Sequence, residues 1–406
     1  MTSKTLVVVG HGMVGHRLAA DLRSRDREGV WRVVVLAEEV RPAYDRVALT
    51  SYLEGRSAAE LSLVDEAFLA DPLVDLRLGT PAAALDRAAR EVVTADGTRV
   101  AYDALVLATG SRPFVPPVPG RELPGCFVYR TIEDLDAIRA AAQGRAGRPA
   151  VVIGGGLLGL EAANALRALG LRTHVVEMAP RLMAVQLDAG GGEVLADLVS
   201  DLGVTVHCGA VTEAIEPGPD GRAGGLRLAG GSVVETDLVV FSAGVRPRDD
   251  LAEPSGLERG ERGGFLVDDR CRTSDERIWA IGECAAVDGR CYGLVAPGYR
   301  MAEAVVDQLL GVADTAFPGA DMSTKLKLLG VDVASFGDAH AATPGAVEYV
   351  RARRDEGVYA KLVLAPDGST LLGGVLAGDA RAYPLLHSLL GRALPGPADQ
   401  LLAGVE

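Results

Sequence analysis

The chain has 406 residues, which is long for one domain, so we expect two or three domains. Its formal net charge of −14 argues against a nucleic-acid partner, because nucleic-acid phosphates require faces rich in lysine and arginine. No apolar run approaches the roughly 18 residues that span a bilayer, and the glycine-broken start is too short for a secretion signal. We therefore expect a cytoplasmic protein with no membrane segment.

The cysteines and histidines of the chain form no recognisable ligand pattern. Five cysteines are present, which is an odd number, and no two of them have C-x-x-C spacing. None of the six histidines has metal-ligand spacing to another histidine or to a cysteine. We therefore expect neither a disulfide framework nor a metal site, and the thiols are predicted to be buried and inert.

The elements at the start of the chain predict a β-α-β unit. The apolar run "TLVVV" (5–9) is typical of a buried strand, and a glycine-rich turn follows it. Met13, Leu18 and Leu22 then have helical spacing. The segment "WRVVVLAEE" (31–39) is predicted to be a second strand, and it ends in acidic residues.

A second β-α-β unit is predicted after a crossing that is rich in proline and glycine. The segment "LVLATGSRPFVPPVPG" (105–120) is predicted to be a strand that leads into this crossing, where a new domain begins. "AVVIGGG" (150–156) is predicted as a strand, and "LLGLEAANALRALG" (157–170) as a helix that ends at a glycine. "RTHVVEMAP" (172–180) is predicted as a strand that carries an acid near its end.

The remaining part of the chain is predicted to hold two further strands and a helix, then a segment rich in strands. "ETDLVVFSAGVRP" (235–247) is predicted to hold a strand that ends in Ala-Gly, and "ERIWAIGECAAV" (276–287) a strand that ends in Gly-acid. "GYRMAEAVVDQLLG" (298–311) is a predicted helix. From about residue 316 the pattern indicates antiparallel strands, with "APDGST" (365–370) as a hairpin turn. A short helical segment is predicted near the end of the chain.

Two glycine-rich turns follow the first strands of the two units, "VVVGHGMVGH" (7–16) and "VVIGGGLLGLE" (151–161). In such a turn the first glycine makes the bend, the second lets the backbone approach a pyrophosphate, and the third lets the helix pack on the strand. The helix start then offers free N–H groups to the phosphates. The glycines are Gly10, Gly12 and Gly15 in the first turn, and Gly154, Gly156 and Gly159 in the second.

An acidic residue at the end of the next strand is expected to bind the ribose hydroxyls in each unit. Glu38 lies 23 residues after Gly15. Glu177 lies 18 residues after Gly159. A carboxylate at position 177 would repel the 2′-phosphate of NADPH, so NADH is favoured, although Arg181 could weaken this preference.

Two complete dinucleotide motifs in one chain indicate electron transfer between two cofactors, FAD and NAD(P)H. "ATGSRP" (108–113) and "AIGECA" (280–285) are further marks of a flavin site. The second of them places Glu283 where the ribityl chain or the pyrophosphate of FAD would pass. The order of these motifs assigns the first glycine turn to FAD and the second to NAD(P)H.

With these motifs, the chain resembles the two-dinucleotide-binding flavoproteins of the pyridine-nucleotide oxidoreductase superfamily. It is most similar to the N-terminal FAD/NAD(P)H module of the assimilatory nitrite reductase large subunit family. The resemblance implies an FAD-dependent NAD(P)H oxidoreductase that passes hydride from NADH to FAD and then electrons to a separate acceptor. The segments that carry it are "GHGMVGHR", "EEVRPAYDRVALTSYL", "GERGG", "DDRCRTSD", "AIGECA", "YGLVAPGYRMAE", "STKLKLLGVDVASFGDAH" and "LPGPADQLL".

The expected fold is α/β, with two Rossmann-like dinucleotide-binding domains in a glutathione-reductase-like arrangement and a C-terminal β-rich α+β domain. A discontinuous FAD-binding domain is expected over 1–114 and 243–315. The NAD(P)H-binding domain is expected over 115–242, and the β-rich domain over 316–406. The β-rich domain could form a homodimer interface, as in many relatives, or only cover the flavin domain.

The resemblance also implies which residues contact the cofactors. Arg46 and Arg130 would neutralise the FAD pyrophosphate, Glu161 would face the nicotinamide, and ordinary surface positions are the alternative for all three. Tyr44, Asp45, Arg46 and Ser51 would shape the flavin face, with structural roles as the alternative. The catalytic candidates are Glu161, Arg46 and Ser51. FAD would contact Gly10, Gly12, Gly15, Glu38, Arg46, Ala82, Thr109, Arg130 and Glu283, with Ala296 and Pro297 near the flavin ring. NAD(P)H would contact Gly154, Gly156, Gly159, Glu161, Glu177 and Gly244.

The sequence departs from the family in three ways. It stops just after "LPGPADQLL" and contains no cysteine cluster for an iron–sulfur centre or sirohaem, so we do not expect it to reduce nitrite alone. Segment 40–52 contains no cysteine and no redox cysteine pair is present, so a covalent thiol mechanism is not expected. His11 stands where the family commonly has a smaller or amide side chain, and it is predicted to face solvent or the adenine.

Three alternative functions stay open at this stage. The chain could be a ferredoxin or rubredoxin reductase that supplies a monooxygenase, although those reductases often have lysine where Ser51 stands. It could be a stand-alone flavoenzyme that acts on a small organic substrate in a biosynthetic pathway. It could also be a redox-sensing flavoprotein that works as a binding module. The expected partner is an electron-acceptor protein or a small-molecule acceptor.

Overall fold

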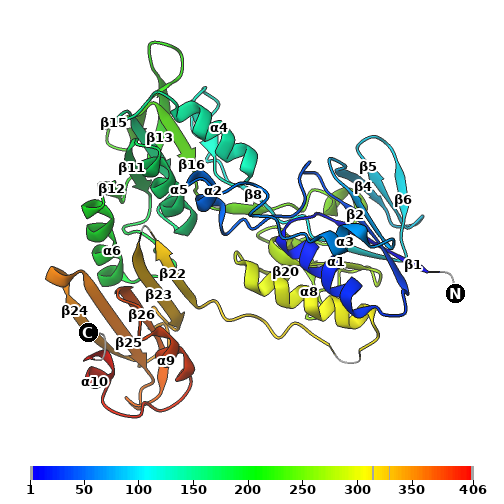
Figure 1. Cartoon of the computed structure of the whole chain (residues 1–406). Coiled ribbons are helices and arrows are strands. Elements are labelled where there is room, and N and C mark those ends of the chain that lie inside the picture. Colours follow the sequence, from blue (N-terminus) through cyan, green and yellow to red (C-terminus); the bar gives the residue numbers. More distant parts are fainter. Residues whose placement is uncertain (1–2, 313–314, 329, 404–406) are drawn as a thin grey trace. The chain divides into compact units, whose positions relative to one another are not determined.

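The computed structural model describes residues 3–312, 315–328 and 330–403 (Figure 1). The chain divides into two compact units, and each unit is built from two stretches of sequence. The first unit contains Met1–Arg112 and Val245–Ala320, and the second contains Pro113–Gly244 and Asp321–Glu406. The second unit therefore includes the whole of the predicted NAD(P)H-binding segment, 115–242, and most of the predicted β-rich segment, 316–406.

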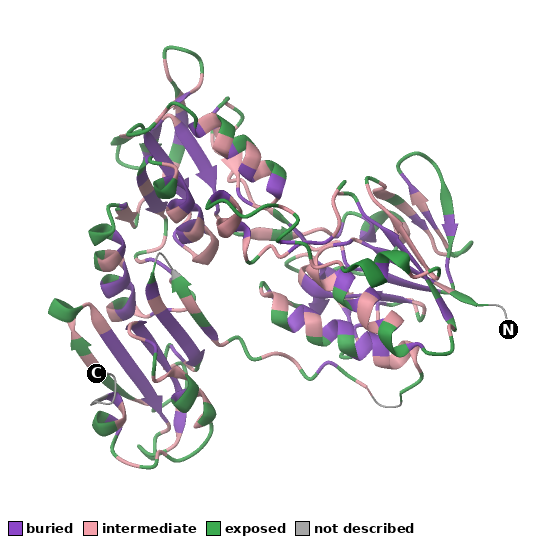
Figure 2. Cartoon of the chain, in the orientation of Figure 1, coloured by how far each residue is buried: buried purple, intermediate pink, exposed green. Residues whose placement is uncertain are grey.

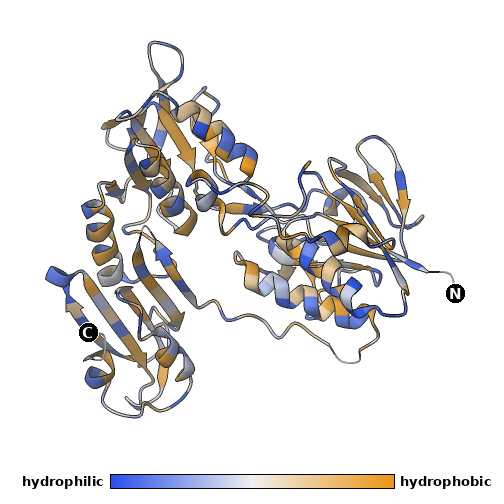
Figure 3. Cartoon of the chain, viewed as in Figure 1, coloured by the Kyte–Doolittle hydropathy of each residue, from blue (hydrophilic) through white to orange (hydrophobic). Residues whose placement is uncertain are grey.

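The first unit is built around a parallel sheet of five strands in the order β19-β7-β1-β2-β3. Its strands are nearly continuous apolar runs, as expected for a parallel sheet that is covered on both faces. Leu6, Val7 and Val8 of β1 are fully buried, and Figures 2 and 3 show that buried and hydrophobic positions coincide along these strands. The strands are β1 (Lys4–Val9), β2 (Trp31–Leu36), β3 (Val74–Arg77), β7 (Ala104–Leu107) and β19 (Ile278–Ala280).

Two long helices of the first unit pack side by side, α1 (Met13–Arg25) and α8 (Val295–Leu309). The helix predicted over 298–311 begins earlier, at Val295. Pro297 lies in its first turn, where a missing backbone N–H loses no helical hydrogen bond. The shorter helices are α2 (Leu49–Leu53), α3 (Glu66–Ala70), α7 (Ala252–Ser255) and the 3-10 helix η1 (Gly282–Cys284).

Three small sheets complete the first unit. One is antiparallel and contains β4 (Ala82–Asp86), β5 (Glu91–Thr94) and β6 (Arg99–Ala101). Another contains β18 (Phe265–Val267), β20 (Ala285–Val287) and β21 (Arg290–Cys291). The third is a two-stranded ribbon of β8 (Ser111–Pro113) and β17 (Val245–Pro247).

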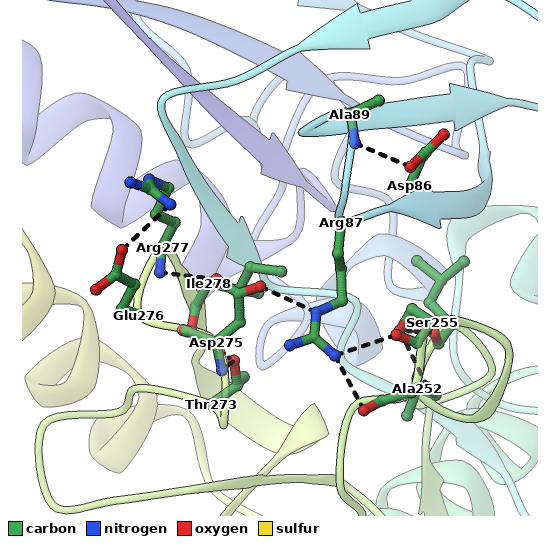
Figure 4. Close-up of polar contacts among 12 residues, drawn as sticks. Asp86, Arg87, Ala89, Ala252, Ser255, Thr273, Asp275, Glu276, Arg277 and Ile278 are labelled. Atoms are coloured by element: carbon green, nitrogen blue, oxygen red, sulfur yellow. Dashed lines mark hydrogen bonds and ion pairs between the residues drawn. The ribbon is translucent and has the colours of Figure 1, made fainter.

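Arg87 attaches the antiparallel sheet to distant segments of the first unit. Figure 4 shows its guanidinium between Asp275 and Ser255. Its Nε donates to the Asp275 carboxylate at 2.9 Å. Its Nη1 donates to the carbonyl oxygens of Ser255 and Gly256 at 3.3 and 3.1 Å. One side chain therefore satisfies three acceptors that lie far from it in sequence.

The second unit contains a parallel sheet of the same kind, in the order β12-β11-β10-β16-β9. Its strands are β9 (Cys126–Val128), β10 (Pro149–Ile153), β11 (Arg172–Glu177), β12 (Thr205–Cys208) and β16 (Leu238–Phe241). Its helices are α4 (Ile132–Ala142), α5 (Leu157–Ala168) and α6 (Ala189–Asp201). An antiparallel sheet of β13 (Thr212–Pro217), β14 (Ala223–Leu228) and β15 (Val233–Glu235) packs with it.

The C-terminal part of the second unit is an antiparallel sheet in the order β22-β23-β26-β25-β24. The predicted hairpin at 365–370 is confirmed, because Ala365 N–H donates to the Thr370 carbonyl at 2.8 Å. The α6 helix packs on β25 and β26. The elements are β22 (Thr324–Leu328), β23 (Val331–Gly337), β24 (Val347–Arg353), 3-10 helix η2 (Arg354–Glu356), β25 (Val358–Leu364), β26 (Leu371–Gly378), α9 (Tyr383–Ser388) and α10 (Ala398–Ala403).

The predicted α/β fold with two parallel dinucleotide-type sheets and a β-rich C-terminal part is confirmed. Two segments that were predicted as strands ending at a glycine do contain such a strand, β16 and β19, and in each case the strand ends shortly before that glycine. The segment 235–247 contains separate strands, and Gly244 at φ +105° interrupts it. The segment 276–287 is broken by η1, which begins at Gly282 with φ +78°. The predicted domain boundaries stay a prediction.

Arg87→Met is expected to lower the free energy of unfolding by about 1–3 kcal/mol, because three acceptors lose a charged donor. The matched control is Arg99→Met in β6, because Arg99 is more than half exposed and its ion pairs lie at the surface. Urea unfolding followed by circular dichroism should show a lower midpoint for the Arg87 variant alone. Equal midpoints for both variants would contradict the anchoring role of Arg87.

Candidate functional site

The first glycine turn connects β1 to α1 and leaves no room for side chains at two of its positions. Gly10 has φ +107°, and a Cβ on it would lie 2.3 Å from the Ala108 carbonyl oxygen. A Cβ on Gly15 would lie 2.2 Å from the Gly10 carbonyl oxygen. No atom lies within 4 Å of a Cβ placed on Gly12. The turn is therefore a backbone cradle that is closed toward the sheet and open at its centre.

The second glycine turn connects β10 to α5 and repeats this geometry. Gly154 has φ +119°, and a Cβ on it would lie 2.2 Å from the Ser242 carbonyl oxygen. A Cβ on Gly159 would lie 2.0 Å from the Gly154 carbonyl oxygen, and nothing lies within 4 Å of one on Gly156. Gly12 and Gly156 are the N-caps of their helices, and neither carries a capping side chain. Both cradles therefore fit a dinucleotide pyrophosphate that accepts hydrogen bonds from backbone N–H groups.

The two predicted ribose acids have different partners. Glu38 forms an ion pair with Arg248, and its side chain is about half exposed, at 53%. Glu177 accepts hydrogen bonds from the backbone N–H groups of Gly155 and Ala179, at 2.5 and 2.6 Å. Glu177 is therefore bonded to the second glycine turn itself, and its role toward a ribose stays a prediction.

Arg46 belongs to a small charged cluster in the loop that follows β2. It forms an ion pair with Glu39 and lies 5.0 Å above the centre of the Tyr44 ring. The Tyr44 hydroxyl donates to the same Glu39 carboxylate at 2.8 Å. Ser51, in α2, donates its hydroxyl to the Ala48 carbonyl at 2.6 Å. Sequence reasoning did not single out Glu39, which nevertheless connects two of the predicted flavin-face residues.

The C-terminal motifs of the first unit come together at the first glycine turn. A Cβ on Gly298 of α8 would lie 2.6 Å from Val14 of α1 and 3.2 Å from Gly282 of η1. This contact places the helix start that carries Ala296 and Pro297, and the η1 segment that carries Glu283, beside the cradle. The "AIGECA" segment, which was predicted to mark a flavin site, thus lies beside the first glycine turn.

Other predicted flavin residues have identifiable partners. The Glu283 carboxylate accepts a hydrogen bond from the Ser111 hydroxyl at 2.7 Å. The Thr109 hydroxyl donates to the Arg248 carbonyl at 2.5 Å. Arg248 therefore contacts two predicted residues, and no local sequence signal identified it. Ala82 packs against the hydrophobic core of the first unit at the start of β4.

The predicted residues divide between the two units. Arg130 belongs to the second unit, although it was assigned to FAD. Gly244 also belongs to the second unit, where its carbonyl accepts a hydrogen bond from Phe114 N–H at 2.9 Å. The first unit holds Gly10, Gly12, Gly15, Glu38, Arg46, Ser51, Ala82, Thr109, Glu283, Ala296 and Pro297. The second unit holds Arg130, Gly154, Gly156, Gly159, Glu161, Glu177 and Gly244.

His11 does not face solvent, so that part of the expectation was wrong, and the adenine side stays a prediction. Its side chain is buried, its Nδ1 accepts a hydrogen bond from Ala43 N–H at 3.2 Å, and its ring stacks on Phe68. The neighbouring His16 is also buried and bonds through Nε2 to the Leu63 carbonyl at 2.8 Å. Burial and the nearby His16 lower the pKa of His11 to about 3, so the imidazole is neutral. It attaches the loop after β2 to the first glycine turn.

Glu161 lies in α5, two residues after the last glycine of the second turn. Burial raises the pKa of its carboxyl to about 7. At neutral pH such a carboxyl is present in both protonation states, which suits a residue that exchanges hydrogen bonds during a reaction. Its predicted position against the nicotinamide stays a prediction.

The prediction that the cysteines are buried is confirmed for Cys271 and Cys284 and is wrong for Cys126, Cys208 and Cys291, which are partly exposed. Burial raises the pKa of all five, to about 11 for Cys126, so the thiolate is disfavoured at neutral pH. Within residues 3–312, 315–328 and 330–403, no helix is long and apolar enough to cross a membrane. Over the same ranges, no group of three or more His, Cys, Asp or Glu side chains could hold a metal ion.

Comparison with known proteins identifies two matching family models. The pyridine nucleotide-disulphide oxidoreductase model matches residues 4–308. The model of the rubredoxin NAD+ reductase C-terminal domain matches residues 323–393. Together the two models cover the two dinucleotide-type sheets and the β-rich sheet.

Similar proteins include nitrite reductase subunits and a ferredoxin reductase. The chain is 54% identical over 404 residues to the nitrite reductase [NAD(P)H] large subunit of Klebsiella oxytoca, covering 99% of this chain and 42% of that protein. It is 47% identical to the nitrite reductase (NADH) large subunit of Escherichia coli K12, covering 99% of this chain and 47% of that protein. The chain thus spans less than half the length of these relatives. The crystal structure of a ferredoxin reductase from Rhodopseudomonas palustris matches with a TM-score of 0.84 at 26% identity and covers 100% of both chains.

These comparisons confirm the resemblance that the motifs predicted. The similarity to the nitrite reductase large subunit extends over almost the whole chain, as the quoted segments indicated. The flavoprotein fold is confirmed by the family model and by the solved structure. The individual cofactor contacts stay predictions.

Glu161→Gln should remove a pH dependence of stability. Because the folded pKa of about 7 lies above the value of about 4.3 for an unfolded glutamate, the free energy of unfolding falls as the pH rises through this interval. Between about pH 5.5 and about pH 8 the contribution is about 2 kcal/mol. From about pH 5.5 to about pH 8, the free energy of unfolding of the Glu161→Gln variant should therefore rise by about 2 kcal/mol relative to that of the unsubstituted protein. Urea unfolding at the two pH values measures this difference.

The exposed Glu213 supplies the control for this measurement, since Glu213→Gln removes a carboxylate at the surface of the same unit. The difference between the control variant and the unsubstituted protein should not change with pH. If the Glu161→Gln difference is equally constant, the buried carboxyl does not titrate as the structure indicates.

Proposed function

This chain belongs to the pyridine nucleotide-disulphide oxidoreductase family and is an FAD-dependent NAD(P)H oxidoreductase, and from that premise we propose that it delivers electrons from NADH to a separate acceptor. The observation that carries this proposal is the repeated glycine cradle, one in each unit. The first cradle adjoins the "AIGECA" segment, which supports FAD there, and the second is left for the nicotinamide dinucleotide. Two cofactors in one chain are what an electron-input module requires.

Bound FAD supplies two-electron acceptance and release, which is chemistry that amino-acid side chains do not provide. The residues of the chain bind and orient the two dinucleotides. The open backbone at Gly12 and Gly156 admits the pyrophosphates, and Glu38 and Glu177 bind the ribose hydroxyls. Arg46 and Ser51 shape the flavin face, and Glu161 faces the nicotinamide.

The proposed preference for NADH over NADPH rests on Glu177 and on the position of Arg181. The Arg181 Nε donates to the Leu187 carbonyl at 2.8 Å, inside the same loop. Its aliphatic stem lies against Gly192, where a Cβ would come within 2.8 Å of the Arg181 Cβ. Arg181 is thus engaged within its own loop, which supports Glu177 as the charge that decides between the two coenzymes.

The proposed domain roles follow from the cradles. We assign FAD to 1–114 and 243–315, NAD(P)H to 115–242, and a covering or dimerising role to the β-rich 316–406. The β24 strand is at the edge of its sheet, and Tyr349 and Val350 on it are 38% and 55% exposed. An edge strand with exposed apolar side chains supports contact with a second copy of the chain. A cytoplasmic location is part of the same proposal.

Two kinds of acceptor are proposed. By analogy with the nitrite reductase large subunits, the electrons would go to a nitrite-reducing centre that lies outside these 406 residues. The second candidate is a small redox protein, as in a ferredoxin or rubredoxin reductase. It is favoured by the match of 323–393 to the rubredoxin reductase C-terminal domain and by the full-length match to a ferredoxin reductase structure.

Anaerobic addition of NADH to the FAD-loaded protein should bleach the visible flavin absorbance. The reduced protein is then offered nitrite with a candidate partner, ferredoxin, rubredoxin, quinones, nitro compounds and oxygen in turn. Rapid repeated turnover with one of these identifies the acceptor. Absence of bleaching would contradict the proposal, and bleaching without turnover on any acceptor would favour a redox-sensing role.

Glu177→Ala should weaken NADH binding by about tenfold, because the ribose hydroxyls lose a charged acceptor. Binding of NADPH should fall less, so the ratio between the coenzymes narrows. Glu177→Gln separates the effect of the carboxylate charge on coenzyme binding from that of the side-chain shape, since the amide oxygen can still accept the Gly155 N–H. Dissociation constants for both coenzymes provide the measurement, with Glu213→Gln as control. An unchanged ratio in both Glu177 variants would show that Glu177 is not the ribose acid.

A further inference from the structure

Tyr359 and Lys361 of β25 lie against the start of α6, and we propose that they are positioning residues for the nicotinamide coenzyme. They act through Asp188, the residue that ends the loop after Glu177. This inference rests on the proposed function, because it gives the two residues a role at the second glycine turn.

Glu177 and the loop over 178–188 that follows it are bonded to both the N–H and the carbonyl group of Gly155 in the second glycine turn. The Glu177 carboxylate accepts the N–H of Gly155 at 2.5 Å. The N–H of Met183 donates to the Gly155 carbonyl at 2.9 Å. Met183 is buried, and its backbone φ of +47° is one that residues other than glycine rarely adopt. A displacement of the loop would therefore displace the turn as well.

The far end of the loop is bonded to the β-rich sheet through both oxygens of Asp188. Its Oδ1 caps α6 by accepting the N–H of Gly191 at 3.0 Å. Its Oδ2 accepts the Tyr359 hydroxyl at 2.6 Å and lies 2.9 Å from the Lys361 Nζ. The Lys361 side chain is 3% exposed, and its ammonium also lies 2.9 Å from Glu348. A buried ammonium needs these carboxylates, so Asp188 is fixed at its position.

The start of α6 fits against the sheet because it carries no side chains there. A Cβ on Gly190 would lie 2.4 Å from the Tyr359 ring, and one on Gly191 would lie 2.9 Å from Val375. A second connection joins the same loop to the sheet, since His340 Nε2 lies 2.8 Å from the Val185 carbonyl. The β-rich sheet thus fixes the loop that runs from the ribose acid to α6.

The expected consequence is an effect on coenzyme binding and not on the reaction. Under the proposed function, the loop adjoins the ribose of the adenosine half, whereas hydride leaves the nicotinamide at the other half. Loosening the loop should therefore raise the dissociation constant of the coenzyme and its KM, with kcat unchanged.

Tyr359→Phe is the cleanest test, because it removes one hydroxyl and leaves the Lys361 ion pairs intact. The dissociation constant for NAD+, measured by calorimetry on the FAD-loaded protein, should rise about fivefold. The KM for NADH should rise by a similar factor, with kcat and the FAD content unchanged. The matched control is Tyr349→Phe on the neighbouring strand β24, which should leave all four quantities unchanged.

Lys361→Met should raise the dissociation constant for NAD+ and the KM for NADH further than Tyr359→Phe does. Its control is Lys327→Met in β22. If the Lys361→Met variant does not fold, the Tyr359→Phe variant still tests the positioning role. A lower melting temperature in Tyr359→Phe with unchanged NAD+ affinity and KM would overturn the inference, because the contact would then only stabilise the fold. Failure of NADH to bleach the flavin of the unsubstituted protein would instead contradict the proposed function.

Discussion

The absence of a side chain at Gly10, Gly15, Gly154 and Gly159 is the constraint on which the rest of the structure depends. At each position a Cβ would lie between 2.0 and 2.3 Å from a backbone carbonyl oxygen, so strand, turn and helix meet by direct backbone contact. Any larger residue would separate helix from sheet. That contact leaves the middle glycine of each turn beside open space, with the helix N–H groups pointing the same way, which is what a diphosphate needs.

The strands, turns and acids could be predicted because their signals are local. An apolar run, a glycine spacing and a following carboxylate are all read within about 30 residues, the length of a β-α-β unit. His11 could not be placed in this way, because its burial depends on Ala43 and Phe68, which arrive from later segments. Arg248 was missed for the same reason, since its ion pair with Glu38 crosses most of the first unit's sequence.

The two predicted ribose acids occupy the same place in their motifs but are oriented by different partners. Glu38 is paired with a cation on an exposed surface, so salt and solvent screen the interaction that orients it. Glu177 is oriented by two backbone N–H groups, which salt affects less. The second site is consequently the more rigidly specified of the two, although the motif alone predicts them to be equivalent.

The glycine-rich start of α6 has a consequence for how the second unit folds. Each glycine in a helix costs about 1 kcal/mol relative to alanine, so the turn over 190–192 has little tendency to form alone. It forms where Tyr359 and Val375 occupy the space that side chains would fill. The first turn of α6 and the β-rich sheet should therefore appear and disappear together, as one cooperative unit in amide hydrogen exchange. A truncation that removes the β-rich sheet should therefore also disorder the first turn of α6, which belongs to the parallel-sheet part of the unit.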